Sequence, residues 1–406
     1  YHFFNDKALA TFDTQTLIRE VVYVESPVDT QNRGTYDLIK VQIIRPQFDG
    51  KLPVVMTASP YHLGINEIAN DAKLHEMTGN LAKKTPHLIT LSDHPTAFPD
   101  YDKVEVPAAP YNQATEHFTH GWTYSLNDYF LSRGFASIYV ASVGTRGSDG
   151  FQTSGDYQQI AGVTAVIDWL NGRTRAFTNR QKTHTITADW ASGHVAMTGK
   201  SYLGTLAYGA ATTGVAGLDV ILAEAGITNW YDYYRENGLV RSPGGFPGED
   251  LDVLAELTYS KNLDAADFVR HNTTYQEQLA DMTAKLDHES GDYNSYWQAR
   301  NYLPNTDKVR ADILLVHGLQ DFNVTTSHAF NFWHALPEHI TKHAFLHQGS
   351  HVYMNNWQSI DFSETINAYF TAKLLSRDLT LNLPAVIWQV PMFSAAAEPA
   401  LTTRFP

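Results

Sequence analysis

Short apolar runs alternate with helical patterns along most of the chain, and this alternation constrains the fold more than any other feature. Runs typical of buried strands cover residues 52–59, 135–142, 194–199, 218–226, 311–318 and 342–348. Helical patterns cover residues 123–134, 157–172, 203–212, 327–336 and 363–375. Such alternation predicts a mostly parallel sheet with helices on both faces, an α/β fold. Two earlier runs, 17–24 and 37–44, predict strands joined as a hairpin.

Two segments interrupt the alternation. A polar stretch from His62 to His120 contains five prolines, and a loop of that length is unusual unless it is functional or inserted. Residues 229–305 are first aromatic, then rich in glycine and proline, then helical, and we interpret them as a helical insertion over the carboxyl edge of the sheet. The expected organisation is a lead-in strand and linker (1–34), a first part of the core (35–228), this insertion (229–305), a second part of the core (306–380) and a C-terminal segment (381–406).

Composition excludes several classes of protein. The net charge of −14 disfavours a nucleic-acid partner, which would need a basic face. No apolar run is long enough to cross a membrane, and the first residues lack the features of a signal peptide. The absence of cysteine excludes disulfides, thiolate metal sites and a cysteine nucleophile, and it fits a cytoplasmic location. Because the chain lacks an initiator methionine, we expect it to begin inside a longer gene product.

The stretch GKSYLG (199–204) connects a predicted strand to a predicted helix. A serine on such a turn is typical of a nucleophile elbow, in which a strained backbone exposes the hydroxyl above the sheet. The usual pattern is G-x-S-x-G, but here Leu203 takes the place of the second glycine, which comes one residue later as Gly204. The alternative is that Ser201 only caps the following helix. The motif by itself leaves both interpretations open.

An acid and a base follow in the order that an α/β-hydrolase requires. Asp321 comes just after the strand at 311–318, and His351 lies in the loop after the strand at 342–348. A serine hydroxyl needs a base to remove its proton, and the imidazole needs an acid to orient it. We therefore expect Ser201, Asp321 and His351 to form a catalytic triad. Asp312, at the opposite end of its strand, is on the wrong side.

Acyl transfer also requires donors for the oxyanion. The amide of Tyr202, directly after the serine, is one candidate. Tyr61, in SPYHLG after the strand at 52–59, is the second, by its hydroxyl or its backbone, although it could equally be a surface aromatic.

Two other patterns are weaker. His343, His347 and His351 have a spacing that would form a metal-binding face on a helix, but the segment has the pattern of a strand. The glycines of GTRGSDG (144–150) lack the strand-to-helix context of a dinucleotide loop, and we interpret the segment as a turn. We therefore expect neither a metal nor a cofactor.

Taken together, GKSYLG, SPYHLG, GLQDFNV and GSHVYM resemble the bacterial Xaa-Pro dipeptidyl-peptidase family, serine peptidases related to cocaine esterase. The resemblance extends from about Asp6 to Gln389. It implies an α/β-hydrolase core with a helical insertion and the release of N-terminal Xaa-Pro dipeptides from peptides. It also implies the triad and the oxyanion-hole residues given above.

The resemblance further implies a substrate pocket. The resemblance implies a proline-binding wall formed by Trp230, Tyr233, Leu254 and Val324, and a donor, Asn323, to the carbonyl of the substrate's first residue. The free amino terminus of the substrate is a cation, and we expect Glu249 or Asp250 to be its acidic anchor. The alternative is that this acidic pair is only a solvated part of a loop. Family members carry further domains, one of them linked to dimer formation, so a homodimer is an expectation for the full-length protein. The tail from Val390 departs from the family pattern.

Two other functions stay open at this level. A related acyl esterase or amidase would use the same triad but would lack the acidic anchor. A truncated protein of the same fold could also be non-catalytic.

Overall fold

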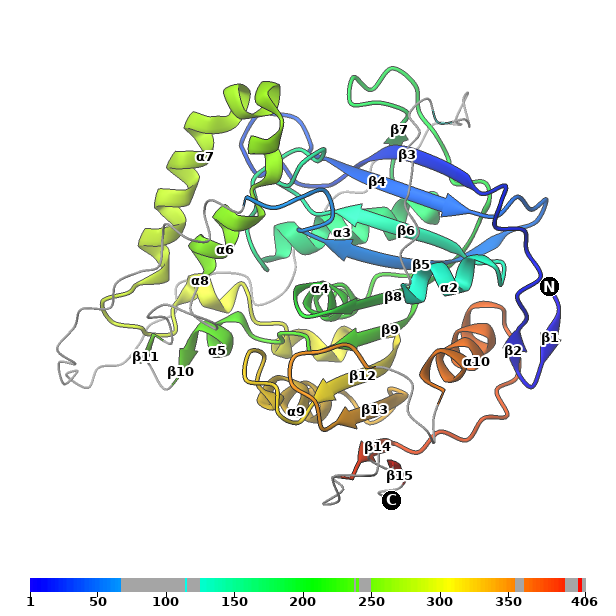
Figure 1. The fold of residues 1–406 in the computed structure, drawn as a ribbon. Helices are drawn as coiled ribbons and strands as arrows, with labels where there is room; N and C mark the ends of the chain where they lie inside the picture. The colour runs from blue at the N-terminus through cyan, green and yellow to red at the C-terminus, as the bar shows by residue number, and fades with distance from the viewer. Residues whose placement is uncertain are drawn as a thin grey trace.

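The computed structural model describes residues 1–66, 114, 125–236, 239–240, 250–354, 361–390 and 401–403. Its centre is a sheet of eleven strands, which are β3 (Ile18–Glu25), β4 (Leu38–Arg45), β5 (Leu52–Ser59), β6 (Ala136–Ala141), β7 (Ala176–Phe177), β8 (Ala191–Lys200), β9 (Leu218–Glu224), β12 (Asp312–Gly318), β13 (Lys342–His347), β14 (Val386–Gln389) and β15 (Leu401–Thr403). They lie in the order β15-β14-β13-β12-β9-β8-β5-β6-β4-β3-β7 (Figure 1).

The middle of this sheet is parallel, as the sequence predicts. All neighbours from β14 to β6 pair in parallel, whereas β15, β4, β3 and β7 are antiparallel to their neighbours. The expected hairpin of β3 and β4 is confirmed. Because β8 lies beside β5 while β6 lies on the other side of β5, the strand order reverses here. Open α/β sheets place their sites at such a reversal.

Side chains of the central strands alternate between the two faces of the sheet. On β9, Ile221 packs in a core cluster with α3 (Tyr157–Leu170), α4 (Tyr202–Ala211) and α9 (Thr326–Ala335). The next residue, Leu222, packs on the opposite face with α2 (Leu126–Leu131) and α10 (Phe362–Leu374). This two-residue period buries apolar side chains on both faces, which is why the strands appear in the sequence as continuous apolar runs.

The inserted segment contains α5 (Trp230–Tyr234), β10 (Arg235–Glu236), β11 (Leu239–Val240), α6 (Leu251–Thr258), η1 (Ser260–Leu263), α7 (Ala265–Leu286), α8 (Ser295–Gln298) and η2 (Leu303–Lys308). In Figure 1 the arrows of β5, β6 and β12 point toward the side where α6, α7 and α8 lie. The insertion therefore stands at the carboxyl edge of the sheet, as expected. Hydrogen bonds join it to the core; for example, Lys261 Nζ donates to Gly150 O at 2.9 Å, and Gln278 Nε2 donates to Thr30 O at 2.7 Å.

Several elements differ from the expectation. The helix predicted at 123–134 is limited to α2, whose first turn is capped by the Ser125 side chain accepting from Asp128 N. Strand β3, placed by the sequence in a lead-in segment, is a member of the central sheet. The C-terminal segment contributes β14, a strand of only four residues, too short for a pattern of its own. A small hairpin, β1 (Phe3–Phe4) with β2 (Lys7–Ala8), packs against α10, where Asn367 Nδ2 donates to Ala8 O at 3.0 Å.

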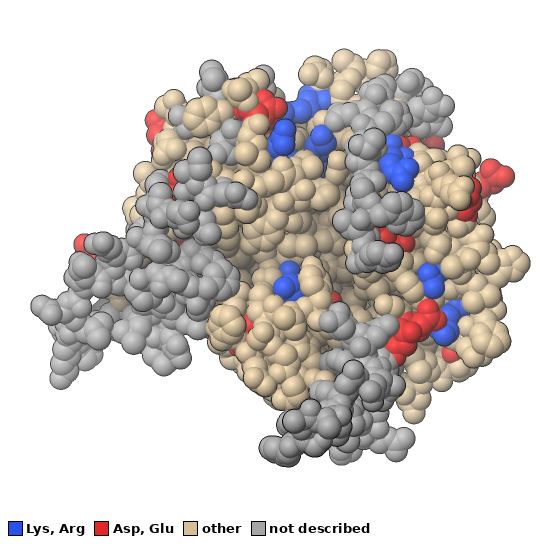
Figure 2. Space-filling view, in the orientation of Figure 1, with Lys and Arg blue, Asp and Glu red and all other residues tan. Residues whose placement is uncertain are grey.

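Most of the polar stretch 62–120 lies outside the described residues. No helix in the described ranges is long and apolar enough to cross a membrane. Figure 2 shows charged residues in small separate groups over a mainly uncharged face.

Removal of a buried side chain tests the central position of β9. Leu222→Ala should lower the free energy of unfolding by about 2–5 kcal/mol, because its side chain is fully buried between β9 and α10. Urea denaturation measures the change. The matched substitution Leu381→Ala, at a site 38% exposed, should change stability by less than about 0.5 kcal/mol. Equal effects of the two substitutions would contradict the assigned core.

Candidate active site

Ser201 occupies the turn between β8 and α4 in a strained conformation. Its φ of 62° and ψ of −126° lie in a region that residues other than glycine rarely adopt, at a typical cost of about 1–3 kcal/mol. Its side chain makes no capping hydrogen bond to α4. The alternative of an ordinary helix-capping serine is therefore wrong, and the backbone is that of an elbow.

Two glycines permit this turn because the backbone is crowded on both sides. A Cβ atom on Gly199 would lie 2.6 Å from the carbonyl carbon of Leu203, and one on Gly204 would lie 2.7 Å from Glu224 O. Both contacts are with backbone atoms, which cannot move aside as a side chain would. The later position of the second glycine therefore places the bare backbone of α4 against the end of β9, while Leu203 is tolerated.

Asp321 and His351 come together at the ends of β12 and β13. Asp321 Oδ2 accepts a hydrogen bond from His351 Nδ1 at 2.8 Å. The other carboxylate oxygen, Oδ1, accepts from the backbone N–H groups of Asn323 and Val324, each at 2.9 Å. The hydrogen bond between His351 Nδ1 and Asp321 orients the imidazole ring, as the acid of a serine hydrolase would. The structure shows no hydrogen bond between Ser201 Oγ and His351, a contact that often tightens only when substrate binds.

A second imidazole, which the sequence analysis did not single out, lies behind the acid. His317 Nε2 is 3.8 Å from Asp321 Oδ2 and donates to Val324 O at 2.8 Å. Burial lowers the pKa of His317, which favours the neutral ring. The available signal was a histidine near the end of the strand that Asp321 follows, but this residue lies in a mainly apolar run and has no motif of its own.

The oxyanion-hole candidates lie at neighbouring strand ends. Tyr61 follows β5, and Tyr202 begins α4 after β8; their rings meet edge to face with centroids 5.9 Å apart. The Tyr202 ring is buried, and its hydroxyl donates to Gln159 Oε1 at 2.9 Å. Tyr202 can therefore serve an oxyanion only through its backbone N–H, which is in the first turn of α4.

A buried side chain that was not predicted from the sequence, Gln159, hydrogen-bonds to the residue after Ser201. Gln159 on α3 accepts from Tyr202 and from Gly155 N, and its Nε2 donates to Ser142 Oγ at 2.8 Å and to Gln152 Oε1 at 2.7 Å. Its four partners satisfy the whole carboxamide, as a buried amide requires. A glutamine on the buried face of a helix was the available signal.

The expected pocket-wall residues Trp230, Tyr233, Leu254 and Val324 all pack in one core cluster with Tyr202. The Trp230 ring lies 4.9 Å from the Tyr202 ring and 6.2 Å from the Tyr233 ring, and its indole N–H donates to Tyr302 Oη at 3.1 Å. The structure thus brings the aromatic residues of the insertion against the residue that follows Ser201.

Asn323 connects this aromatic group to the Asp321–His351 pair. Its backbone N–H donates to Asp321, and its Oδ1 accepts from the Tyr233 hydroxyl at 2.7 Å. With the carboxamide oxygen engaged by Tyr233, the Nδ2 group is left to donate elsewhere.

The two acidic anchor candidates differ in what the structure says of them. Glu249 lies outside the described residues. Asp250 is fully buried, and its Oδ2 is 3.0 Å from Arg235 Nη1 and 2.8 Å from His288 Nε2. Its Oδ1 accepts from Leu251 N at the start of α6. Both oxygens of Asp250 therefore have partners within the insertion.

The structure shows the local backbone of the histidine and glycine patterns to be a strand and a turn. His343 and His347 lie on the strand β13, so the helical spacing needed for a metal face is not formed. His343 Nδ1 is bonded to Pro384 O at 3.0 Å, and His347 Nδ1 accepts from Gly349 N at 3.1 Å. Within the described ranges there is no cluster of potential metal ligands. GTRGSDG is a turn, closed by Gly144 N donating to Asp149 O at 2.7 Å.

A mostly parallel sheet covered on both faces, with a serine elbow and an Asp–His pair at its carboxyl edge, defines an α/β-hydrolase. A model of the family described as X-Pro dipeptidyl-peptidase (S15 family) matches residues 34–353, and the chain belongs to this family.

A curated Xaa-Pro dipeptidyl-peptidase from Streptococcus pneumoniae is 57% identical over 391 residues, which are 96% of this chain and 51% of that protein. The chain therefore spans about half the length of the curated relatives it matches.

Two solved structures share the fold at low identity. A CocE/NonD family hydrolase from Staphylococcus aureus is 14% identical with a TM-score of 0.55, over 95% of this chain and 58% of that one. An aminopeptidase from a marine sediment Thaumarchaeota archaeon is 15% identical with a TM-score of 0.53, over 96% of this chain and 59% of that one.

A single methyl group tests the elbow. Gly204→Ala should slow labelling of Ser201 by a fluorophosphonate at least about tenfold, because the new Cβ would press on the backbone of β9 and displace the turn. The control Gly162→Ala is also in a helix, but the nearest atom to its Cβ would be the end of the flexible Ile39 side chain at 3.2 Å. Labelling of Gly204→Ala at the normal rate would contradict the role given to this glycine.

Proposed function

We propose that the chain is the catalytic region of a serine exopeptidase that releases Xaa-Pro dipeptides from the amino terminus of peptides. Membership of the family and the 57% identity to curated proteins of that name support the proposal. The observation that carries it is the hydrogen-bonded series from Tyr233 through Asn323 to Asp321 and His351. It joins a buried cluster of aromatic side chains directly to the proposed acid and base.

In the proposed reaction, His351 Nε2 removes the proton of Ser201 Oγ, which attacks the carbonyl carbon of the substrate's proline. Tyr61 and the Tyr202 amide stabilise the oxyanion, and Asp321 stabilises the imidazolium. His351 then gives its proton to the departing amine, leaving a dipeptidyl ester on Ser201. A water molecule, deprotonated by His351, hydrolyses the ester, and the proton returns to Ser201.

The pocket chemistry explains the proposed preference for proline. The proposed pocket wall consists of four apolar side chains that are buried in one core cluster with Tyr202: Trp230, Tyr233, Leu254 and Val324. A proline ring is a compact apolar group that suits such a wall. We assign the Nδ2 group of Asn323, whose Oδ1 accepts from Tyr233, as the donor to the carbonyl of the residue before proline. A larger or charged side chain would leave this surface poorly matched.

Recognition of the free amino terminus is assigned to the segment that contains Glu249 and Asp250. Because Arg235 and His288 hold the Asp250 carboxylate inside the insertion, Asp250 fixes the start of α6. We therefore propose Glu249, the preceding residue, as the group that meets the substrate ammonium. The homodimer of the full-length protein and a cytoplasmic location remain proposals from the sequence.

Turnover of matched chromogenic substrates tests the function. The chain should hydrolyse Ala-Pro-p-nitroanilide with a kcat/KM well above that for Ala-Ala-p-nitroanilide, and Ser201→Ala should lower the rate by at least about 10⁴-fold. Hydrolysis of a simple acyl ester without turnover of either amide would favour the esterase alternative. Unchanged turnover by Ser201→Ala would overturn the triad.

The anchor has its own test. Glu249→Gln should raise KM for Ala-Pro-p-nitroanilide about tenfold or more, because an ammonium would lose its ionic partner, while an N-blocked ester should be little affected. The exposed Glu289 provides a matched control, and Glu289→Gln should affect neither substrate. An equal loss with both substrates would remove Glu249 from this role.

A further inference from the structure

Glu224 is a buried carboxyl group at the last position of β9, directly beside the nucleophile turn. It pairs with Lys200 in the parallel register of β8 and β9, and its backbone carbonyl accepts from Ser201 N at 2.8 Å. The residue is 6% exposed. The reaction proposed above makes no use of it, and neither does the core packing, which would be served by an apolar side chain.

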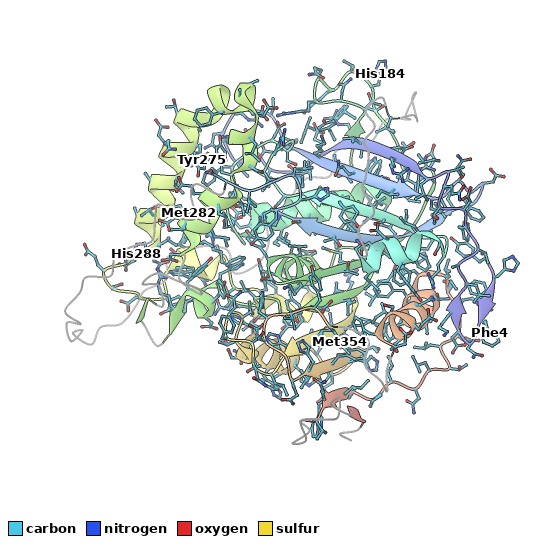
Figure 3. All side chains as sticks on the ribbon, viewed as in Figure 1. Phe4, His184, Tyr275, Met282, His288 and Met354 are labelled. Carbon is cyan, nitrogen blue, oxygen red and sulfur yellow. The ribbon has the colours of Figure 1, made fainter. Side chains whose placement is uncertain are left out.

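The side chain of Glu224 instead contacts the loop that carries His351. Its Oε2 accepts a hydrogen bond from Met354 N at 2.8 Å. Met354 packs in the core cluster between the sheet and α10, and Figure 3 shows it near the centre of the molecule, away from Tyr275 and Met282 on α7. Glu224 thereby fixes the loop three residues beyond His351.

Lys200 holds the same loop at its other end. Its Nζ donates to the backbone carbonyl of His351 at 3.3 Å and lies 4.8 Å from the centre of the Tyr353 ring. The Glu224 carboxylate in turn attracts the Lys200 ammonium. Lys200 and Glu224 thus bind opposite ends of the segment from His351 to Met354.

Burial disfavours the ionised form of the Glu224 carboxyl group. Desolvation raises the pKa of Glu224 to about 7, against the opposing effects of the Met354 N–H and Lys200. A glutamine has the same shape and could accept the same hydrogen bond from Met354 without a charge to desolvate. Hydrogen bonding alone therefore does not account for a carboxyl group at this position.

We propose that Glu224 and Lys200 are positioning residues that hold the His351 loop against the Ser201 turn, with the charge of Glu224 fixing the Lys200 ammonium on the His351 carbonyl. The proposal rests on the triad of the proposed function. It makes the alignment of the base with the nucleophile depend on a group outside the triad.

The pH dependence follows from the groups that face Glu224. Lys200 faces it from β8 and Tyr353 from the loop, while β12 presents Val316 opposite it. Because the pKa of Glu224 in the folded protein is above its ordinary value, its contribution to stability is complete below about pH 4.5 and is lost as the pH rises through about 7. The ionised form that aligns His351 is thus the form that destabilises the fold.

This opposition supplies the test, because a structural role would move activity and stability in the same direction. At pH 8.5, Glu224→Gln should raise the thermal unfolding midpoint of the 406-residue chain yet slow fluorophosphonate labelling of Ser201 by about tenfold or more. As the pH falls through about 7, the wild-type rate should lose the part that depends on ionised Glu224, whereas the variant, which lacks this carboxyl group, should not show that loss. Lys200→Met, which removes the other contact, should also slow labelling.

Glu25→Gln is the matched control. Glu25 is the last residue of β3, which β5, β6 and β4 separate from β8 in the sheet. Its side chain is 2% exposed and forms ion pairs with Arg175 and Lys182. Glu25→Gln should therefore lower the unfolding midpoint, while Ser201 should be labelled at the wild-type rate. Two outcomes would overturn the positioning role. One is labelling of Glu224→Gln at the wild-type rate across the pH range. The other is slower labelling of this variant together with a lower unfolding midpoint at pH 8.5. Fluorophosphonate labelling needs no peptide substrate. If the unmodified protein is labelled at Ser201 but does not hydrolyse Ala-Pro-p-nitroanilide, the proposed substrate is refuted and the positioning role of Glu224 is unaffected.

Discussion

The close approach of α4 to the ends of β8 and β9 is the constraint on which the rest of the site depends. It requires bare backbone at Gly199 and Gly204 and places Ser201 at a positive φ. The strain is local, but it is sustained by a parallel sheet whose neighbouring strands are fully buried. A serine held in this way has its hydroxyl directed by the fold rather than by its own hydrogen bonds.

The other site residues are connected to this turn through polar groups buried among apolar ones. Gln159 supports Tyr202, and Asp321 receives His351 on one oxygen and two backbone amides on the other. Asn323 extends the same series to the aromatic cluster of the insertion. In a low-dielectric surrounding such satisfied networks are rigid, so the positions of this cluster and of the Asp321–His351 pair are set jointly.

Much of the fold could be predicted because hydrophobic periodicity is a local property. The strand at 52–59 coincides with β5, and Asp321 and His351 follow strands whose carboxyl ends do meet. Glu224 could not be predicted, since a single glutamate at the end of an apolar run says nothing of Met354, 130 residues further along the chain. The burial and paired state of Asp250 likewise depend on Arg235 and His288, which reach it across the insertion.

The sequence by itself determined the alternation of strands and helices, the order of serine, acid and base, and the glycines of the elbow, because each is written in residues close together. The tertiary structure decided which carboxyl groups are held inside the protein, how Asn323 is oriented and what holds the loop of His351. These depend on desolvation and on hydrogen bonds between distant segments, which exist only once the sheet has brought the strand ends together.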